Sequence, residues 1–460
     1  MGFSSSSVLL RSICRKGVVG SSSSNYHILG KWWWSRSGAS WFNHRGVGTA
    51  TATTASEAQY SSPWLMLSPE LEGGTMSTKF YSLAADSIVR TPSSPSDVIR
   101  NRILACRGSS HGWLALVSPQ DDDFFLYNPI SGRHINLPSI FNLSKFPPRL
   151  SDDEDDPIHR RNVKKFILSC SPDEENCRAV VINFRGGLAV CCPGRSKEWT
   201  LMFDERRVRS VYEDIVYSDK LKLFFLLTNS SGIETWDLGD LSSPKFVKVD
   251  AVDWDEYYFI SPIRRALSLM FLSGIGSVCY LVVAKEEDNL LLVVRHMIDF
   301  VGPDGQCFDI LDERRPDYVR GDDVAFYDKL DKCPVRCNYM TIGFDIWKHD
   351  PKNGKFNYLD SSSLGGLAIF VGKHSHSVAI PATEFPELKP NSIYFTDGYN
   401  TGELDGRLTG RSFTIGRGGH DIGIFNYKNR TVSPCYYPCD APSLKPILPG
   451  PIWFYPTPTN

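Results

Sequence analysis

Residues 112–129 read GWLALVSPQDDDFFLYNP, and this stretch decides the fold. An apolar run follows Gly112, a turn rich in Pro and Asp interrupts it, and an aromatic run then ends at Asn128-Pro129. Short runs of aliphatic, β-branched and aromatic residues between such turn clusters are typical of β-hairpins. The stretch therefore predicts two antiparallel strands joined by a tight turn.

Similar units recur along the chain. Gly187–Cys191 leads to Trp199, Leu223–Leu226 leads to Glu234–Asp237, and Ile342–Trp347 is a looser echo. Few windows show a helical period, and repeated hairpins without a clean repeat length predict an all-β, β-propeller-like fold of six to eight irregular blades, with minor helix in insertions. A large sandwich or paired barrels are the alternatives. We expect four tryptophans to pack between sheets, Trp113, Trp199, Trp236 and Trp347, and Ile452–Tyr455 to pack as part of ring closure.

The first 56 residues contain six Lys and Arg, many Ser and no acidic residue, since the first acid is Glu57. This composition is typical of a transit peptide, and Val8–Leu10 is too short for the apolar core of a secretory signal. We expect residues 1–56 to be a transit peptide or disordered and residues 61–460 to form one large domain. The expected destination is the mitochondrion, with the chloroplast or dual targeting as alternatives. Met1–Ser6 also fits a loose myristoylation pattern.

The remaining residues hold 44 basic against 52 acidic side chains, a net charge of −8. This balance argues against nucleic-acid binding, so we interpret the basic clusters Arg160–Lys165 and Arg206–Arg209 as solvated surface. The longest apolar run, Val278–Ala284, is strand-sized, which excludes a membrane span by a helix. Eleven scattered cysteines do not indicate a secreted disulfide framework.

No convincing catalytic motif occurs. The sequence has no P-loop, no G-x-G-x-x-G and no H-E-x-x-H pattern. Gly108–Gly112 matches G-x-S-x-G, but a hydrolase elbow needs a helix after the serine, and here the match joins two predicted strands. We therefore expect a β-turn, no enzyme activity and no cofactor.

Weak candidates for metal ligands exist. Structural zinc requires four ligands, often as spaced Cys pairs, and two His side chains two residues apart on a strand would point to the same face. The spacing is unspecific, so we assign no metal and interpret these residues as loop cysteines and surface histidines, with a thiol switch as an alternative for either cysteine pair. The candidates are Cys333 with Cys337, Cys435 with Cys439, and His374 with His376.

Several blocks together resemble a plant family described as domain of unknown function 295, the KIB-type β-propeller, which is often attached to F-box proteins. Singly the blocks are unspecific, but their order is fairly specific and covers about residues 63–455. They are Pro63–Leu67, Ser110–Leu114, Leu126–Gly132, Ile135–Pro138, Asp214–Tyr217, Phe344–Trp347, Asn391–Asp397, Asp421–Phe425 and Pro451–Phe454.

In this family, the members best understood in function are substrate adaptors of ubiquitin ligases, with a helical F-box before the propeller. The segment before Pro63 has no leucine-rich helical pattern, so the chain looks like an organelle-directed branch that lacks the F-box. The expected function is a non-enzymatic organellar module that binds protein partners. The alternatives are an F-box-type ligase adaptor and a redox or zinc-dependent protein.

Overall fold

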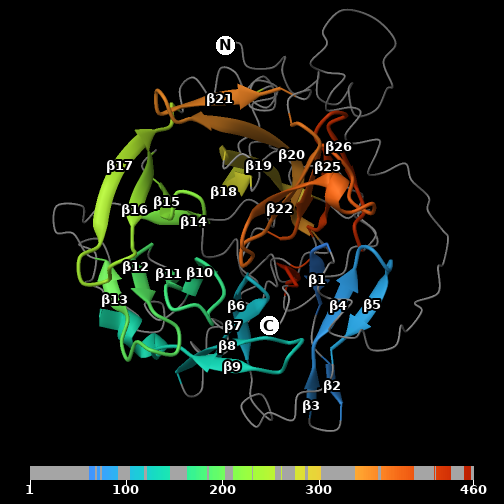
Figure 1. Ribbon diagram of the computed structural model, residues 1–460. Helices are drawn as coiled ribbons and strands as arrows, with labels where there is room; N and C mark the ends of the chain where they lie inside the picture. Colours follow the sequence, from blue (N-terminus) through green and yellow to red (C-terminus); the bar gives the residue numbers. More distant parts are fainter. Residues whose placement is uncertain are drawn as a thin grey trace, which may run out of the picture.

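The computed structural model describes residues 62–67, 70–72, 75–91, 104–118, 122–145, 163–183, 186–202, 211–229, 232–253, 261, 275–284, 289–301, 337–360, 364–397, 419, 421–436 and 450–456. These residues form strands arranged as radial sheets around a common centre (Figure 1). The expected transit peptide, Cys333 and Cys439 lie outside the described residues.

Four sheets have four strands each, and we call each sheet a blade. Blade one joins both ends of the chain: β27 (Ile452–Phe454), β1 (Trp64–Met66), β4 (Lys79–Ser82) and β5 (Ser87–Arg90). Blade two contains β6 (Ala105–Ser110), β7 (Trp113–Ser118), β8 (Asp123–Tyr127) and β9 (His134–Asn136). Blade three contains β10 (Val163–Leu168), β11 (Ala179–Asn183), β12 (Leu188–Cys191) and β13 (Thr200–Met202). Blade four contains β14 (Tyr212–Ser218), β15 (Leu223–Thr228), β16 (Gly232–Asp237) and β17 (Lys245–Ala251).

The other two blades are fused into one curled sheet by parallel pairing of β18 with β23. Blade five contains β18 (Ile275–Ala284), β19 (Asn289–Val301), β20 (Cys337–Asp350) and β21 (Lys355–Leu359). Blade six contains β22 (Leu367–Val371), β23 (Val378–Pro381), β24 (Ser392–Phe395), β25 (Gly423–Asn426) and β26 (Thr431–Ser433). A hairpin of β2 (Glu70–Glu72) and β3 (Thr75–Ser77) and two 3-10 helices, η1 (Ile140–Lys145) and η4 (Ala382–Glu384), complete the described elements.

Six apolar clusters hold the blades together, one between each pair of neighbours. Strand β7 shows the reason, because successive side chains of a strand point to opposite faces. Trp113 and Ala115 pack toward blade three, whereas Leu114 and Leu116 pack toward blade one. Each blade is thus buried on both faces, and six interfaces close a ring of six blades. The expected β-propeller-like fold is confirmed.

All four tryptophans expected between sheets lie there. Trp113 and Trp199 share the cluster between blades two and three, Trp236 lies between blades three and four, and Trp347 lies between blades four and five. The indole Nε1 of Trp199 donates a hydrogen bond to the carbonyl of Pro138 at 2.9 Å. Large aromatic side chains therefore supply much of the contact area between blades.

The ring closes where the two ends of the described chain meet. Strand β27 pairs antiparallel with β1, which places Leu65 opposite Trp453 and Trp64 opposite Phe454. The indole of Trp453 is fully buried and contacts the ring of Phe370 in blade six, with centroids 5.0 Å apart. One short strand thus joins blade six to blade one, as expected for the aromatic end of the chain.

The units that the sequence pattern predicted at residues 112–129, 187–191, 223–237 and 342–347 correspond to β7, β8, β12, β15, β16 and β20, but the pattern predicted no strand of blade one. Strands β1, β4 and β5 have only three or four residues, too few to show a clear period of two, and β4 and β5 also contain Lys, Arg or Ser. The strand state of β1 depends on pairing with β27, which lies more than 350 residues away in sequence, and β4 and β5 follow β1 in the sheet. No helix among the described residues has the length and apolarity to cross a membrane.

We predict that Trp453→Ala lowers the free energy of unfolding by about 4 kcal/mol, because it leaves a cavity at the closure of the ring. Urea unfolding of the full chain measures the change. Phe141→Ala, which truncates a half-exposed ring of η1, serves as the control and should have little effect. Equal effects of the two substitutions would contradict the importance of the β1–β27 closure.

Candidate functional site

The first strands of successive blades lie next to one another around the ring centre (Figure 1). Polar side chains connect several of these blades. Each connection is a hydrogen bond from a backbone amide of one blade to a side chain of another, which satisfies a buried polar group. The bonds run from Leu168 N to Ser110 Oγ (3.1 Å), from Leu281 N to Asp214 Oδ2 (2.8 Å) and from Trp453 N to Ser375 Oγ (2.8 Å).

Two segments meet at the centre, residues 107–111 of blade two and residues 373–377 of the β22–β23 loop. We call them together the central cluster. Ser109 and Ser375 form an isolated parallel bridge. The amide of Ser109 donates to the carbonyl of His374 at 2.9 Å, and the amide of His376 donates to the carbonyl of Ser109 at 3.0 Å. A loop of the sixth blade therefore crosses toward the second.

Two glycines permit this close approach. A Cβ at Gly108 would lie 2.7 Å from Cβ of Phe166, and a Cβ at Gly372 would lie 2.2 Å from Oγ1 of Thr396. The G-x-S-x-G match thus has a structural cause. Its serine ends β6 and a His111-Gly112 turn with positive φ leads directly into β7, so the expected β-turn is confirmed and no helix follows.

Cationic side chains gather at the central cluster. Lys165 forms a buried ion pair with Asp214 at 2.9 Å, and Lys164 pairs with Glu213. Lys373 has neither an ion pair nor a hydrogen bond to its ammonium among the described residues. Burial and the positive charges of Lys164 and Arg107 outweigh the opposing effect of carboxylates and lower the pKa of Lys373 to about 8.

The sequence placed Lys164 and Lys165 in a solvated basic cluster, and this interpretation is wrong for Lys165, whose ammonium is buried against Asp214. The cause is the alternation of β10 together with a bulge between Val163 and Lys165, which turns the side chain toward blade four. Arg160, Arg161 and the cluster Arg206–Arg209 lie outside the described residues.

The histidines of the central cluster contact one serine. Ser110 Oγ lies 3.0 Å from Nδ1 of His111 and 3.4 Å from Nδ1 of His376, and the two imidazole rings are 5.6 Å apart. The ring of His374 bonds the backbone carbonyl of Arg107. Burial, followed by the nearby Lys373 and Arg107, lowers the pKa of His374 well below its usual value, so this ring is neutral at pH 7.

Three buried polar atoms of the central cluster have no hydrogen-bond partner among the described residues: Ser109 Oγ, His374 Nδ1 and Ser377 Oγ. Buried polar groups are normally paired, and an unpaired one costs about 1–3 kcal/mol. Several buried polar groups of the central cluster thus have no protein partner within the described part of the chain.

The structure describes only some of the weak metal candidates, because Cys333 and Cys439 lie outside the described residues. His374 and His376 lie in a loop rather than on the strand assumed in the sequence argument, and Cys435 packs on the apolar cluster between blades six and one. Cys337 is the first residue of β20, and the environment of its side chain is not described. Within the described ranges, no three His, Cys, Asp or Glu side chains are grouped as metal ligands.

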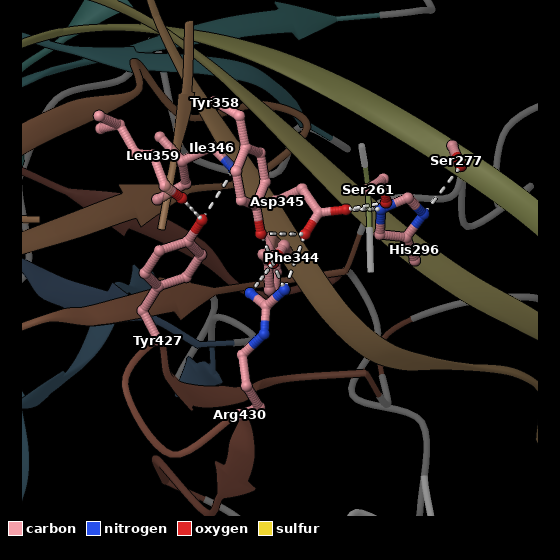
Figure 2. A network of polar contacts seen from close by, with 10 residues as sticks. All are labelled: Ser261, Ser277, His296, Phe344, Asp345, Ile346, Tyr358, Leu359, Tyr427 and Arg430. Carbon is pink, nitrogen blue, oxygen red and sulfur yellow. Dashed lines mark hydrogen bonds and ion pairs between the residues drawn. The ribbon is translucent and has the colours of Figure 1, made fainter. Parts of the chain in front are cut away.

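Figure 2 shows a second polar network, at the seam between blades five and six. Asp345 on β20 accepts hydrogen bonds from His296 Nε2 at 3.0 Å, from Arg430 Nη2 at 2.8 Å and from the hydroxyl of Ser261. Burial would raise the pKa of this carboxyl, but His296, Arg430 and Ser261 outweigh it and lower the pKa to about 2. Asp345 is therefore an ionised carboxylate inside the protein.

The order of Ser277, His296 and Asp345 resembles a hydrolase relay, since Ser277 Oγ lies 3.4 Å from His296 Nδ1. The imidazole is fully buried, and Asp345 divides its oxygens among four donors, from His296, Arg430, Ser261 and Tyr358. Arg430 also donates to the carbonyl of Phe344 at 2.6 Å, which ties the β25–β26 turn to β20. We interpret the network as a structural joint between blades rather than as a catalytic group.

The sequence argument missed Lys373 and the pair Cys170 and Cys177. Cys177 contacts Cys170 across the β10–β11 turn, with its Sγ 3.4 Å from the carbonyl of Cys170. The hydrogen bond from the thiol of Cys177 lowers the pKa of Cys170 and raises that of Cys177. The Ser-Pro-Asp turn between them was the available signal. Nothing in the sequence marks Lys373, because the charged groups around it come from four different blades.

A comparison with protein-family models finds a match to the KIB1-4 beta-propeller over residues 80–426. No curated protein sequence matches the chain significantly.

Several solved structures are similar to the chain at low sequence identity. The β-propeller domain of Cps50 (Swd1) from Myceliophteria thermophila shares 9% identity and a TM-score of 0.27, with 55% of this chain and 68% of that chain covered. The extracellular domain of a hybrid two-component system from B. thetaiotaomicron shares 9% identity and a TM-score of 0.25, with 50% of this chain covered but only 26% of that chain. Neither likeness carries an argument about function.

We predict that Asp345→Asn lowers the free energy of unfolding at pH 7 by about 3 kcal/mol, because it leaves Arg430 buried without its counter-charge. The carboxyl has a lower pKa in the folded protein than its usual value of 3.8, so its contribution is complete above pH 4 and is lost as the pH falls toward 2. Urea unfolding at pH 7 and pH 3 should therefore show a smaller difference between the variant and the natural protein at pH 3.

The control for this experiment is Asp219→Asn, which breaks the exposed pair with Lys222 and should change stability little. A loss of stability for Asp345→Asn that is the same at both pH values would contradict the assignment of an ionised, paired carboxylate.

Proposed function

The chain belongs to the KIB1-4 β-propeller family, and from this membership we propose that it is a non-enzymatic module that binds a protein partner inside an organelle, the mitochondrion in the first instance. Propellers present rims and edges of a rigid ring, and such surfaces suit protein recognition. The observation that carries the proposal is the outer edge of blade four.

Strand β17 is the outermost strand of blade four and pairs only with β16 among the described residues. It exposes three large apolar side chains, with 36% of Phe246, 49% of Val247 and 58% of Val249 accessible. The two other exposed large apolar side chains of the described residues, Phe141 and Leu221, lie apart from it in sequence. Apolar residues gathered on an exposed edge mark an interaction surface.

A bulge explains how the side chains reach solvent. The register between β16 and β17 shifts between Thr235 and Trp236, so that Val247 is the extra residue and turns outward. The ring of Phe246 remains in contact with Trp236, with centroids 5.5 Å apart, which fixes one end of the surface. Lys245 begins the strand with an exposed ammonium, so the partner we propose brings apolar side chains followed by a carboxylate.

Import into an organelle is supported by the acid-free, Arg- and Ser-rich residues 1–56. Entry into an organelle would separate the chain from cytosolic ubiquitin ligases. A function as an organellar module and a function as a ligase adaptor therefore exclude each other. A cytosolic or nuclear location would instead favour the function of a ligase adaptor.

We predict that the full chain, fused at its C-terminus to a fluorescent protein, enters mitochondria, whereas a chain that starts at Ser61 stays in the cytosol. The reason is that the positive, acid-free segment supplies the import signal. Co-localisation with a mitochondrial and a chloroplast marker reads out the result. A cytosolic or nuclear location of both forms would disprove the organellar part of the proposal.

We predict that the double substitution Val247→Glu and Val249→Glu removes the partner, because it places two charges on an apolar contact surface. The full chain and the variant are purified after cross-linking in the cell, and their partners are compared by quantitative mass spectrometry. The control is Phe141→Glu, which alters an equally exposed apolar residue on η1. The same proteins from all three forms would show that β17 is not the contact, and no specific protein from any form would contradict the interaction module itself.

A further inference from the structure

Two cysteines with free thiols, Cys170 and Cys177, face each other across the β10–β11 turn of blade three. The antiparallel register continues one pair beyond the strands, because the amide of Ser169 donates to the carbonyl of Arg178 at 3.0 Å. The next pair in this register is Cys170 with Cys177. Their contact is direct, since Cys177 Sγ lies 3.4 Å from the carbonyl oxygen of Cys170 and a hydrogen bond joins the two thiols.

The backbone at this pair suits a disulfide. The amide of Arg178 also bonds to Ser169, through its Oγ at 2.9 Å, so the following pair takes the place of a non-hydrogen-bonded pair. Cα atoms of such pairs are about 4.5 Å apart, within the range of about 4.4–6.8 Å that a disulfide spans. A bond between Cys170 and Cys177 therefore needs little movement of the chain.

The two thiols differ in access and in acidity. Cys170 is half-buried, whereas Cys177 is buried. The hydrogen bond from Cys177, together with one from Ser169, outweighs burial and lowers the pKa of Cys170, while the same contact and burial raise the pKa of Cys177. Because the thiolate is the nucleophile, Cys170 is the thiol that reacts first with a solute, and Cys177 is the second thiol.

Neighbouring blades hold the turn in this conformation. Arg133 of the β8–β9 turn pairs with Asp173 through both terminal nitrogens of its guanidinium group. Arg178 donates from Nε to the carbonyl of Leu238 in blade four at 3.1 Å. Residues 173–176 remain exposed, so the turn is fixed where the two sulfurs meet and is still open to solvent.

We propose that Cys170 and Cys177 form a site of reversible thiol–disulfide exchange with a small disulfide of the glutathione class. The thiolate of Cys170 attacks one sulfur of glutathione disulfide, whose S–S bond breaks, and one glutathione leaves. The sulfur of Cys177 then attacks Cys170 in the mixed disulfide, and the second glutathione leaves. The two cysteines are oxidised to one disulfide, one glutathione disulfide is reduced to two thiols, and the protons of the cysteine thiols end on these two thiols.

This site goes beyond the interaction surface at β17, and neither proposal depends on the other. Trypsin isolates the pair for the test, because cleavage after Lys165 and Arg178 gives a peptide of residues 166–178 with no other cysteine. The reduced full chain is incubated with glutathione disulfide, and the remaining thiols are blocked with iodoacetamide in urea before digestion. We expect the peptide to have lost two hydrogens and to carry no alkyl group, whereas the chain kept in reduced glutathione carries two.

Two variants separate the roles of the cysteines. In Cys177→Ser the second thiol is absent, so glutathione should stay attached to Cys170. In Cys170→Ser only the buried thiol remains, and it should take up glutathione about tenfold or more slowly than Cys177→Ser does. The matched control is Cys192→Ser, at a half-buried cysteine of the β12–β13 turn, and should form the disulfide in residues 166–178 as the natural chain does.

Circular dichroism confirms the folding of each variant, and Cys177→Ala provides a second variant if serine disturbs the buried position. The proposal is overturned if the folded chain forms no disulfide within residues 166–178, or if Cys170→Ser and Cys177→Ser take up glutathione equally fast. The same difference between these two variants in urea would also overturn it, because the difference would then come from the peptide rather than from the fold.

Discussion

The structure depends on the closure of the ring by a pair of three-residue strands from opposite ends of the described chain. Every blade is apolar on both faces, so every blade needs a neighbour on each side, and the last blade must therefore meet the first. Pairing of β1 with β27 meets this need, and Trp453 continues the apolar contact into blade six. The six clusters between blades are stable only as a complete circle.

Within that circle, polar groups divide into two kinds. At the seam of blades five and six they are satisfied: fully buried Arg295 donates to Thr341 Oγ1 at 2.7 Å and to Asp421 Oδ2 at 2.9 Å, and Asp345 holds Arg430. Fully paired buried networks rigidify a protein and specify one arrangement. At the central cluster, Lys373 and Ser377 lack such partners among the described residues. The paired network at the seam of blades five and six therefore serves the scaffold, whereas the central cluster retains unpaired polar groups among the described residues.

The two proposed sites occupy different blades. The apolar edge β17 faces outward from blade four, and the pair of Cys170 and Cys177 lies at the β10–β11 turn of blade three (Figure 1). Family membership alone describes the scaffold, because sites are added to a fold by particular side chains.

The sequence by itself determined the fold class, several strands of blades two to five and the burial of the four tryptophans, because runs such as Trp113–Val117 carry their pattern locally. It also singled out His374 and His376, but as candidate metal ligands on a strand, whereas they lie in the β22–β23 loop that pairs with Ser109. Only the tertiary structure decided the first blade, the buried pairing of Lys165 with Asp214 and the isolation of Lys373. The physical reason is that pairing, burial and charge compensation depend on groups from other blades, and no local pattern records which distant groups will meet.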